Sequence, residues 1–295
     1  MPNAHGEPKN NGGAGSAGPR NRRDLPAAER APLVLEALKS AYPDPRIALD
    51  FTNPLECVIA TVLSAQSTDA KINEVTKTLF VKYRRPEDYL SVPETELQDD
   101  LRPTGFFNQK TKSMRGLSQK LIDDYDGQVP STIAELVTLP GVARKTANIV
   151  QANCFPETLK IDPDAGVAVD THVGRVAARL GFTKHGSKEA EKIERDLMAL
   201  YPKEEWPLVP NHFIMHGRMT CDAKRPRCED CVVEPLCPSS QEAGLIDLFR
   251  VPPKKKTVRK KATKKKTARK KSTAKKPTRK KTNTKKSGRR RNESG

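Results

Sequence analysis

Four cysteines near the C-terminal end of the chain are the residues best suited to chemistry. They follow the spacing Cys-x6-Cys-x2-Cys-x5-Cys within 17 residues and are Cys221, Cys228, Cys231 and Cys237. The other two cysteines, Cys57 and Cys154, lie inside apolar helical patterns. A disulfide framework is therefore not expected, and the spacing predicts a site for an iron–sulfur cluster. Zinc stays open as an alternative, because four thiolates also bind Zn²⁺.

A second candidate site surrounds the short turn LPGVA at 139–143, which joins two helical patterns. A glycine-containing turn at a helix start leaves backbone N–H groups pointing outward with the helix dipole behind them, and this geometry receives a phosphate. Lys145 follows the turn, where the dipole and partial desolvation disfavour its ammonium form. A neutral lysine amine is a nucleophile. An ordinary helical hairpin is the alternative interpretation.

Asp170 directly precedes the helical pattern THVGRVAARL. Aspartate is a favoured helix N-cap, and this role alone would explain the residue. A capping carboxylate also stays ionised and oriented, because it accepts backbone N–H bonds. Beside a sugar, such a carboxylate stabilises an oxocarbenium ion or assists an attack at C1′. Asp170 is therefore a candidate for both roles.

Positive charge is concentrated in residues 251–295, which contain 22 Lys and Arg and one acidic residue. The whole chain has a net charge of +18, whereas residues 1–250 carry 32 basic and 35 acidic residues. We expect the tail 251–295 to be disordered and to bind nucleic acid non-specifically through phosphate. A solvated tail, a nuclear address and an anionic membrane surface are the alternatives. Residues 1–24 predict a disordered leader without a secretory signal, and no apolar run predicts a membrane span.

The apolar periodicity predicts an all-α fold. Proline residues at or near helix starts and glycine residues just beyond helix ends agree with the predicted boundaries. The predicted helices are 27–42, 54–66, 69–84, 93–101, 108–125, 131–138, 143–154, 170–180, 187–201 and 206–220.

Four segments, LPGVARKTAN, AVDTHVGRV, LSAQSTD and HGRMTCDAKRPRCEDCVVEPLC, together resemble the endonuclease III family of helix–hairpin–helix DNA glycosylases over roughly residues 30–238. The resemblance implies a two-lobed helix–hairpin–helix glycosylase fold with a C-terminal [4Fe-4S] cluster loop, held by the four cysteines. One lobe would comprise 25–46 plus 157–238. The other, with six helices, would comprise 47–156 and contain the hairpin at 131–154. The tail lies outside the resemblance.

Carried over by position, the resemblance implies that Lys145 is a Schiff-base nucleophile and Asp170 the catalytic carboxylate. It makes Asp69 a pocket residue. The implied DNA contacts are Gln66, Phe106, Gly141, Ala143, Arg144, Lys224, Arg225 and Arg227. Without the resemblance, Gln66 would be an ordinary residue at a helix end, and Phe106 or its neighbour Phe107 could belong to the core.

The chain departs from the family pattern at two places. Ala143 stands where the family usually has glycine, and we expect it to adopt a negative φ and to weaken phosphate binding slightly. The segment 155–166 is longer than usual by several residues and contains Asp162 and Asp164. The catalytic roles implied for Lys145 and Asp170 require that the two residues lie close together despite this longer segment.

The resemblance implies a bifunctional DNA glycosylase and abasic-site lyase that excises oxidised pyrimidines in base excision repair. The expected partner is duplex DNA with an oxidised pyrimidine or an abasic site, bound by a monomer without a membrane. The expected location is a bacterial cytoplasm, associated with the nucleoid, or a nucleus if the source is eukaryotic. A mismatch-adenine glycosylase and a DNA-packaging protein driven by the tail are the alternatives.

Overall fold

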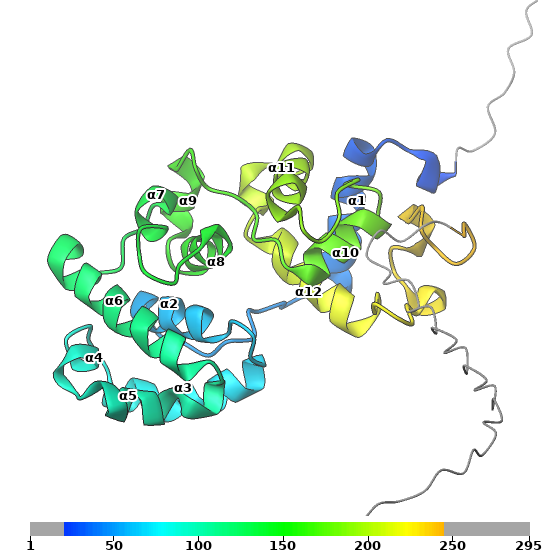
Figure 1. Cartoon of the computed structure of the whole chain (residues 1–295). Coiled ribbons are helices and arrows are strands. Elements are labelled where there is room, and N and C mark those ends of the chain that lie inside the picture. The colour runs from blue at the N-terminus through cyan, green and yellow to red at the C-terminus, as the bar shows by residue number, and fades with distance from the viewer. Residues whose placement is uncertain (1–20, 245–295) are drawn as a thin grey trace, which may run out of the picture. The chain divides into compact units, whose positions relative to one another are not determined.

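The computed structural model describes residues 21–244. The basic tail and most of the predicted leader lie outside these residues. Helices and short 3-10 turns are the only regular elements in the described part of the chain, and no strand occurs there (Figure 1). The predicted all-α fold is confirmed. None of the helices described is both long and apolar enough to cross a membrane.

The first hydrophobic core is built from a continuous stretch of chain. Its helices are α2 (Pro54–Leu63), α3 (Asp69–Lys82), α4 (Asp88–Ser91), α5 (Glu94–Leu101), α6 (Phe107–Tyr125), α7 (Ile133–Leu136) and α8 (Arg144–Cys154). Fully buried side chains such as Ile59, Leu63 and Leu117 hold these helices together. Helix α2 packs on both α8 and α6, so the helix that carries Lys145 is supported by the centre of this core.

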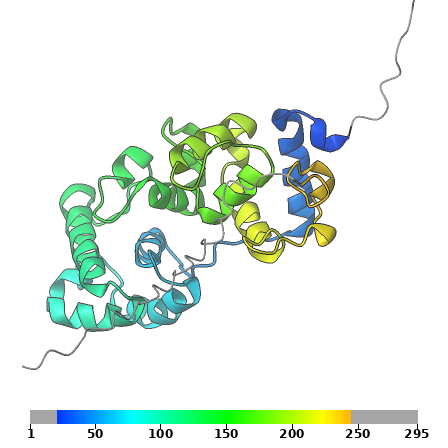
Figure 2. The same ribbon diagram turned by 45° about the vertical axis from the view of Figure 1, so that its right-hand side comes forward.

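The second core combines the start of the chain with its later helices. Helix α1 (Ala27–Ala41) packs against α11 (Ala190–Leu200) and α12 (Leu208–Met219), and α12 packs against α10 (Thr171–Arg179). The turned view shows α1 in blue beside the yellow and orange segments (Figure 2). Val34, Val173 and Phe213 are among its buried residues. The cysteine segment packs on this core through Cys221, Cys231 and Cys237.

Several helix boundaries have clear local causes. Pro54 is the first residue of α2, a position where proline is favoured. The preceding residue, Asn53, caps this helix, because its side chain accepts a hydrogen bond from the Glu56 N–H at 3.0 Å. Gly127 and Gly181 follow α6 and α10 with φ of 75° and 67°, a region that favours glycine. These signals are local, and for this reason the helix pattern was readable from the sequence.

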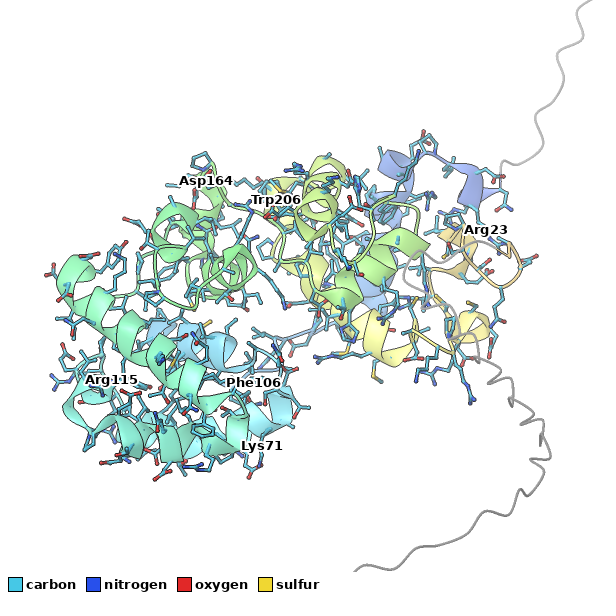
Figure 3. All side chains as sticks on the ribbon, viewed as in Figure 1. Arg23, Lys71, Phe106, Arg115, Asp164 and Trp206 are labelled. Atoms are coloured by element: carbon cyan, nitrogen blue, oxygen red, sulfur yellow. The ribbon has the colours of Figure 1, made fainter. Side chains whose placement is uncertain are left out.

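The structure differs from the sequence expectations in three segments. Two short helices, α4 and α9 (Pro156–Ile161), were not predicted, because four and six residues are too few to show a period. The helix predicted for 54–66 ends at Leu63. Residues Arg22–Asp24, assigned to a disordered leader, form a 3-10 turn. Arg23 secures this turn by ion pairs to Glu234 and Glu242, which are too distant in sequence to be anticipated (Figure 3).

Candidate active site

The hairpin between α7 and α8 has the geometry of an anion site. Gly141 has φ of 86°, and a Cβ there would lie 3.0 Å from Ser113 Cβ and 3.1 Å from Val62 Cγ1. Glycine is therefore required both by conformation and by space. Ala143 is the N-cap of α8 with φ of −91°, as expected, and no side chain among the described residues caps this helix. Backbone N–H groups at the start of α8 remain available to a ligand.

Asp170 is the N-cap of α10. Its Oδ1 accepts hydrogen bonds from the backbone N–H groups of His172 and Val173, both at 2.8 Å, and its Oδ2 lies 3.2 Å from His172 Nδ1. Burial acts to raise the pKa of Asp170, but the bonds from His172 and Val173 and the charge of Lys145 hold this pKa below its usual value. The carboxylate is ionised at neutral pH.

Lys145 and Asp170 line one cavity of about 130 Å³ between the two cores. The Lys145 side chain is exposed to solvent, not partly desolvated as the sequence suggested. The remaining lining comes from both cores and includes Asp69 and Arg218. These two form an ion pair at 2.7 Å that links the start of α3 to α12. An amine, an ionised carboxylate and a concave space are therefore brought together.

Arg144, a predicted DNA contact, also has partners within the protein. Its guanidinium forms an ion pair with the buried carboxylate of Glu194 at 3.0 Å and donates to the Asp164 carbonyl at 3.1 Å. Asn148, one turn later on α8, donates to the same Glu194 oxygen at 2.8 Å. The Arg144 side chain is thus engaged within the protein, and its first effect is to anchor α8 to α11.

Gln66 and Phe106 occupy exposed turns of the first core with unusual backbone angles. Their φ values are 56° and 49°. Phe106 is 64% exposed, whereas Phe107 packs against the core (Figure 3). Phe107 also lies under the Arg102 guanidinium, 4.6 Å from the ring centroid. Of the two phenylalanines, Phe106 is the more exposed, and Phe107 is partly buried.

The four clustered cysteines line one cavity together with Arg179 and His216. All four are free thiols. Arg179 donates to Cys221 Sγ at 3.2 Å and to the Asp222 carbonyl at 2.7 Å, and His216 Nε2 lies 3.7 Å from Cys231 Sγ. Among residues 21–244, no three His, Cys, Asp or Glu side chains are grouped so that they could hold a metal ion. The four cysteines therefore line a common space.

The basic residues of the cysteine loop face solvent. Asp222 Oδ1 accepts hydrogen bonds from the backbone N–H groups of Lys224 and Arg225, at 2.8 and 3.0 Å, and shapes the turn. Lys224, Arg225 and Arg227 are exposed, and Arg227 also donates to the Met219 carbonyl. A surface of positive charge is thus displayed by a loop that the cysteine segment holds in place.

Sequence reasoning did not single out three residues of this region. His172 was visible only as part of the motif around Asp170, and Arg218 only as part of the segment before Cys221. Glu194 gave no signal, because its partners Arg144 and Asn148 are 50 and 46 residues away. Glu194 and Arg218 act through tertiary contacts, which no local pattern encodes, whereas the contact of His172 with Asp170 is local.

Comparison with known proteins finds one matching family model and several similar DNA repair proteins. Residues 59–203 match the family model described as HhH-GPD superfamily base excision DNA repair protein. Endonuclease III of Synechocystis sp. is 43% identical over 213 residues, or 72% of this chain and 94% of the relative. Endonuclease III of Bacillus subtilis is 44% identical over 208 residues, 70% and 91% of the two chains. The structure resembles a trapped endonuclease III–DNA covalent intermediate, with a TM-score of 0.67, 39% identity and coverage of 75% and 100%.

Proposed function

Because the chain belongs to the endonuclease III family of base excision DNA repair proteins, we propose that it is a bifunctional DNA glycosylase and abasic-site lyase acting on oxidised pyrimidines in duplex DNA. The observation that carries this proposal is the shared cavity of Lys145 and Asp170. The amine and the carboxylate supply the two functions that this reaction needs, a nucleophile and a stabiliser of positive charge.

The target base must first leave the helix, since its glycosidic bond is inaccessible within the stack, and a damaged base costs less to extrude. Asp170 then stabilises the positive charge that develops on the sugar as the C1′–N bond breaks. The neutral amine of Lys145 attacks C1′ as the base departs with the electrons of the C1′–N bond, and the new C1′–N ammonium loses one proton. The lone pair of this nitrogen then expels O4′ from C1′, O4′ takes up a proton, and the opened sugar is joined to Lys145 as a protonated imine.

Strand cleavage follows from the imine. The C=N bond withdraws electrons and acidifies the C2′ protons, so that a base can remove one of them. The electron pair forms a C1′–C2′ enamine and then expels the 3′ phosphate, which breaks the C3′–O bond. Hydrolysis of the imine releases the unsaturated aldehyde and restores Lys145 as an amine. Excision and nicking therefore use the same nitrogen.

We propose that Gln66 and Phe106 enter the DNA at the place of the extruded nucleotide. Both are exposed, and an aromatic ring stacks on bases without sequence preference. The N–H groups beyond Gly141 and Ala143 bind one backbone phosphate, and Lys224, Arg225 and Arg227 bind others. Arg144 contributes its backbone N–H, since its side chain is engaged with Glu194.

We also propose that Cys221, Cys228, Cys231 and Cys237 hold a [4Fe-4S] cluster. All four cysteines line one cavity, and four thiolates are the ligand set of such a cluster, which supports this proposal. Arg179 supplies a positive charge and a hydrogen bond to Cys221. A cluster held by these four cysteines would fix the basic loop, whereas Lys145 and Asp170 carry out the reaction in their own cavity.

The proposal is tested with a duplex that contains one thymine glycol. Wild type should release the base and leave a nicked strand with an unsaturated aldehyde at its 3′ end, measured by gel electrophoresis and mass spectrometry. Asp170→Asn should slow base release at least about 100-fold, because it removes the charge that stabilises the sugar cation. Base release by wild type without any nicking would instead indicate a monofunctional glycosylase that uses water.

A further inference from the structure

The carboxylate of Asp170 is held at both oxygens. Oδ1 accepts the two backbone N–H groups at the start of α10, which the helix itself provides. Oδ2 is held by a side chain, the imidazole of His172, whose Nδ1 lies 3.2 Å away. A carboxylate fixed at Oδ1 alone can still rotate about its Cβ–Cγ bond within the limits of those two hydrogen bonds. The contact at Oδ2 removes this freedom.

The His172 ring is itself placed by a close approach to α12. A Cβ at Gly217 would lie 3.2 Å from His172 Cβ, 3.4 Å from its Cδ2 and 3.1 Å from Arg175 Nη2. Arg175 is in turn fixed by the Gly217 carbonyl at 2.8 Å and the Cys221 carbonyl at 3.1 Å. A methyl group at position 217 would therefore crowd the ring and require His172 or Arg175 to shift by a few tenths of an ångström.

Electrostatics at the pair favour the ionised carboxylate. The hydrogen bond from His172 is the largest of the influences that hold the pKa of Asp170 below its usual value, against the opposing effect of burial. Lys145 on α8 lines a second cavity together with Asp170 and His172, and its charge also favours a negative charge on Asp170. Without His172, burial would act on the carboxylate with less opposition.

We propose that His172 is a positioning residue for base excision: its Nδ1–H holds Oδ2 of Asp170, so that the carboxylate stays ionised and aimed at the sugar. The inference rests on the glycosylase activity proposed above. It concerns the step in which the C1′–N bond breaks, since only this step develops the charge that Asp170 faces. Cleavage of a preformed abasic site starts from an aldehyde and does not use this contact.

Two substitutions separate the hydrogen bond from the bulk of the ring. His172→Leu removes the donor, and His172→Asn keeps an N–H close to the position of Nδ1. Single-turnover base release from a thymine glycol duplex and cleavage of a preformed abasic site are measured for each. For His172→Leu we expect about tenfold or more loss of base release, with abasic-site cleavage within about twofold of wild type. His172→Asn should recover most of the loss.

The pH profile gives a readout that a purely structural role would not change. Base release requires ionised Asp170, so its acid limb should move to higher pH in His172→Leu and return toward wild type in His172→Asn. Gly217→Ala, whose methyl group would crowd the His172 ring and the Arg175 guanidinium while leaving the imidazole chemically unchanged, should reproduce the selective loss of base release. If His172→Leu and Gly217→Ala both lose base release but keep abasic-site cleavage, an effect specific to leucine at position 172 is excluded.

Equal loss of both activities in His172→Leu, or no loss of either, would overturn the inference while leaving the glycosylase assignment intact. An unshifted acid limb would do the same. A wild-type enzyme that cleaves abasic sites but releases no base from any oxidised pyrimidine duplex would instead remove the proposed function, and this inference with it. The wild-type control thus distinguishes the two failures.

Discussion

Phe106 and Gln66 adopt left-handed backbone angles, which are uncommon for residues other than glycine. A bulky residue persists in this region only where its surroundings fix it, and such residues concentrate at functional sites. For Phe106 the surroundings include Lys110, a buried lysine that donates to the Thr104 carbonyl at 2.8 Å. The turn that carries the exposed ring is therefore anchored from inside the core.

Phe106→Ala should weaken binding to lesion-containing duplex about tenfold or more, because base–aromatic stacking contributes about 1–3 kcal/mol. Its melting temperature should stay close to that of wild type, since the ring is 64% exposed. Phe107→Ala is the matched control: it removes a ring that packs on the core and should lower the melting temperature. Titration of a fluorescent duplex and thermal unfolding separate the two effects. Equal DNA affinity of wild type and Phe106→Ala would contradict the role given to Phe106.

At the scale of elements, the segment 155–166 around α9 is held in place by the buried carboxylate of Asp162. Asp162 accepts hydrogen bonds from the Ile133 N–H at 2.8 Å, from Gln151 Nε2 at 2.6 Å and from the Asp164 N–H at 2.9 Å. Burial acts to raise its pKa, but these bonds and the charge of Lys203 hold the pKa of Asp162 below its usual value. Asp162 thus links the end of α9 to the start of α7 and to α8.

This contact predicts a pH-dependent stability. A carboxylate whose pKa is lowered in the folded state stabilises the fold at pH values above its pKa in the unfolded chain, which is about 4 for aspartate. This stabilisation is lost as the pH falls through the pKa of the folded state. Asp162→Asn should reduce the free energy of unfolding by about 2 kcal/mol at pH 7. The difference should shrink between pH 5 and pH 3, as urea denaturation at each pH would measure.

Glu157→Gln, on the exposed side of α9, is the control. A difference that stays constant down to pH 3 would show that the Asp162 charge is not the cause.

A second contact between elements joins α8 to α11 through Glu194. A Cβ at Gly166 would lie 1.8 Å from Glu194 Oε1 and 3.0 Å from Arg144 Nη2. Gly166→Ala should therefore displace this ion pair and lower stability by about 1–3 kcal/mol. Gly186→Ala, whose Cβ would have no neighbour within 4 Å, is the matched control. Thermal unfolding of both variants checks the prediction. Equal melting temperatures would mean that the segment shifts freely to accommodate the methyl group.

The elements show where the sequence was informative. Helices α1, α6 and α10 have full apolar periods, and all three were predicted. The turn at Gly141 was equally legible, because one residue type meets a local conformational need. Glu194, Arg218 and the ion pair of Arg144 were not predicted, since each depends on which distant helix lies opposite. Features that depend on neighbouring residues could therefore be predicted from the sequence, whereas contacts between distant helices could not.

At the scale of the whole molecule, the cavity depends on both cores. Lys145 comes from the first core and Asp170 precedes a helix of the second, with the ion pair of Asp69 and Arg218 between them. Neither core alone would place the amine beside the carboxylate. The chain also carries its positive charge far from this site in sequence, since 22 Lys and Arg fall in residues 251–295. Chemistry and general DNA affinity should therefore be separable.

Deletion of 251–295 should weaken binding to undamaged duplex and flatten its dependence on salt, because the slope follows the number of phosphates neutralised. Single-turnover excision at saturating enzyme should change little. Fluorescence anisotropy between about 50 and 200 mM salt measures the slope for the full chain and the deletion. An unchanged slope would show that the tail does not neutralise phosphate.

The most direct test of the account is borohydride trapping on a duplex with one thymine glycol, with iron content matched between variants. Wild type should give a covalent protein–DNA adduct, because borohydride reduces the imine between Lys145 and C1′. Lys145→Ala should give none, whereas Lys160→Ala, which removes an exposed lysine of α9, should trap as wild type does. An adduct of equal yield in Lys145→Ala would contradict the assignment of the nucleophile.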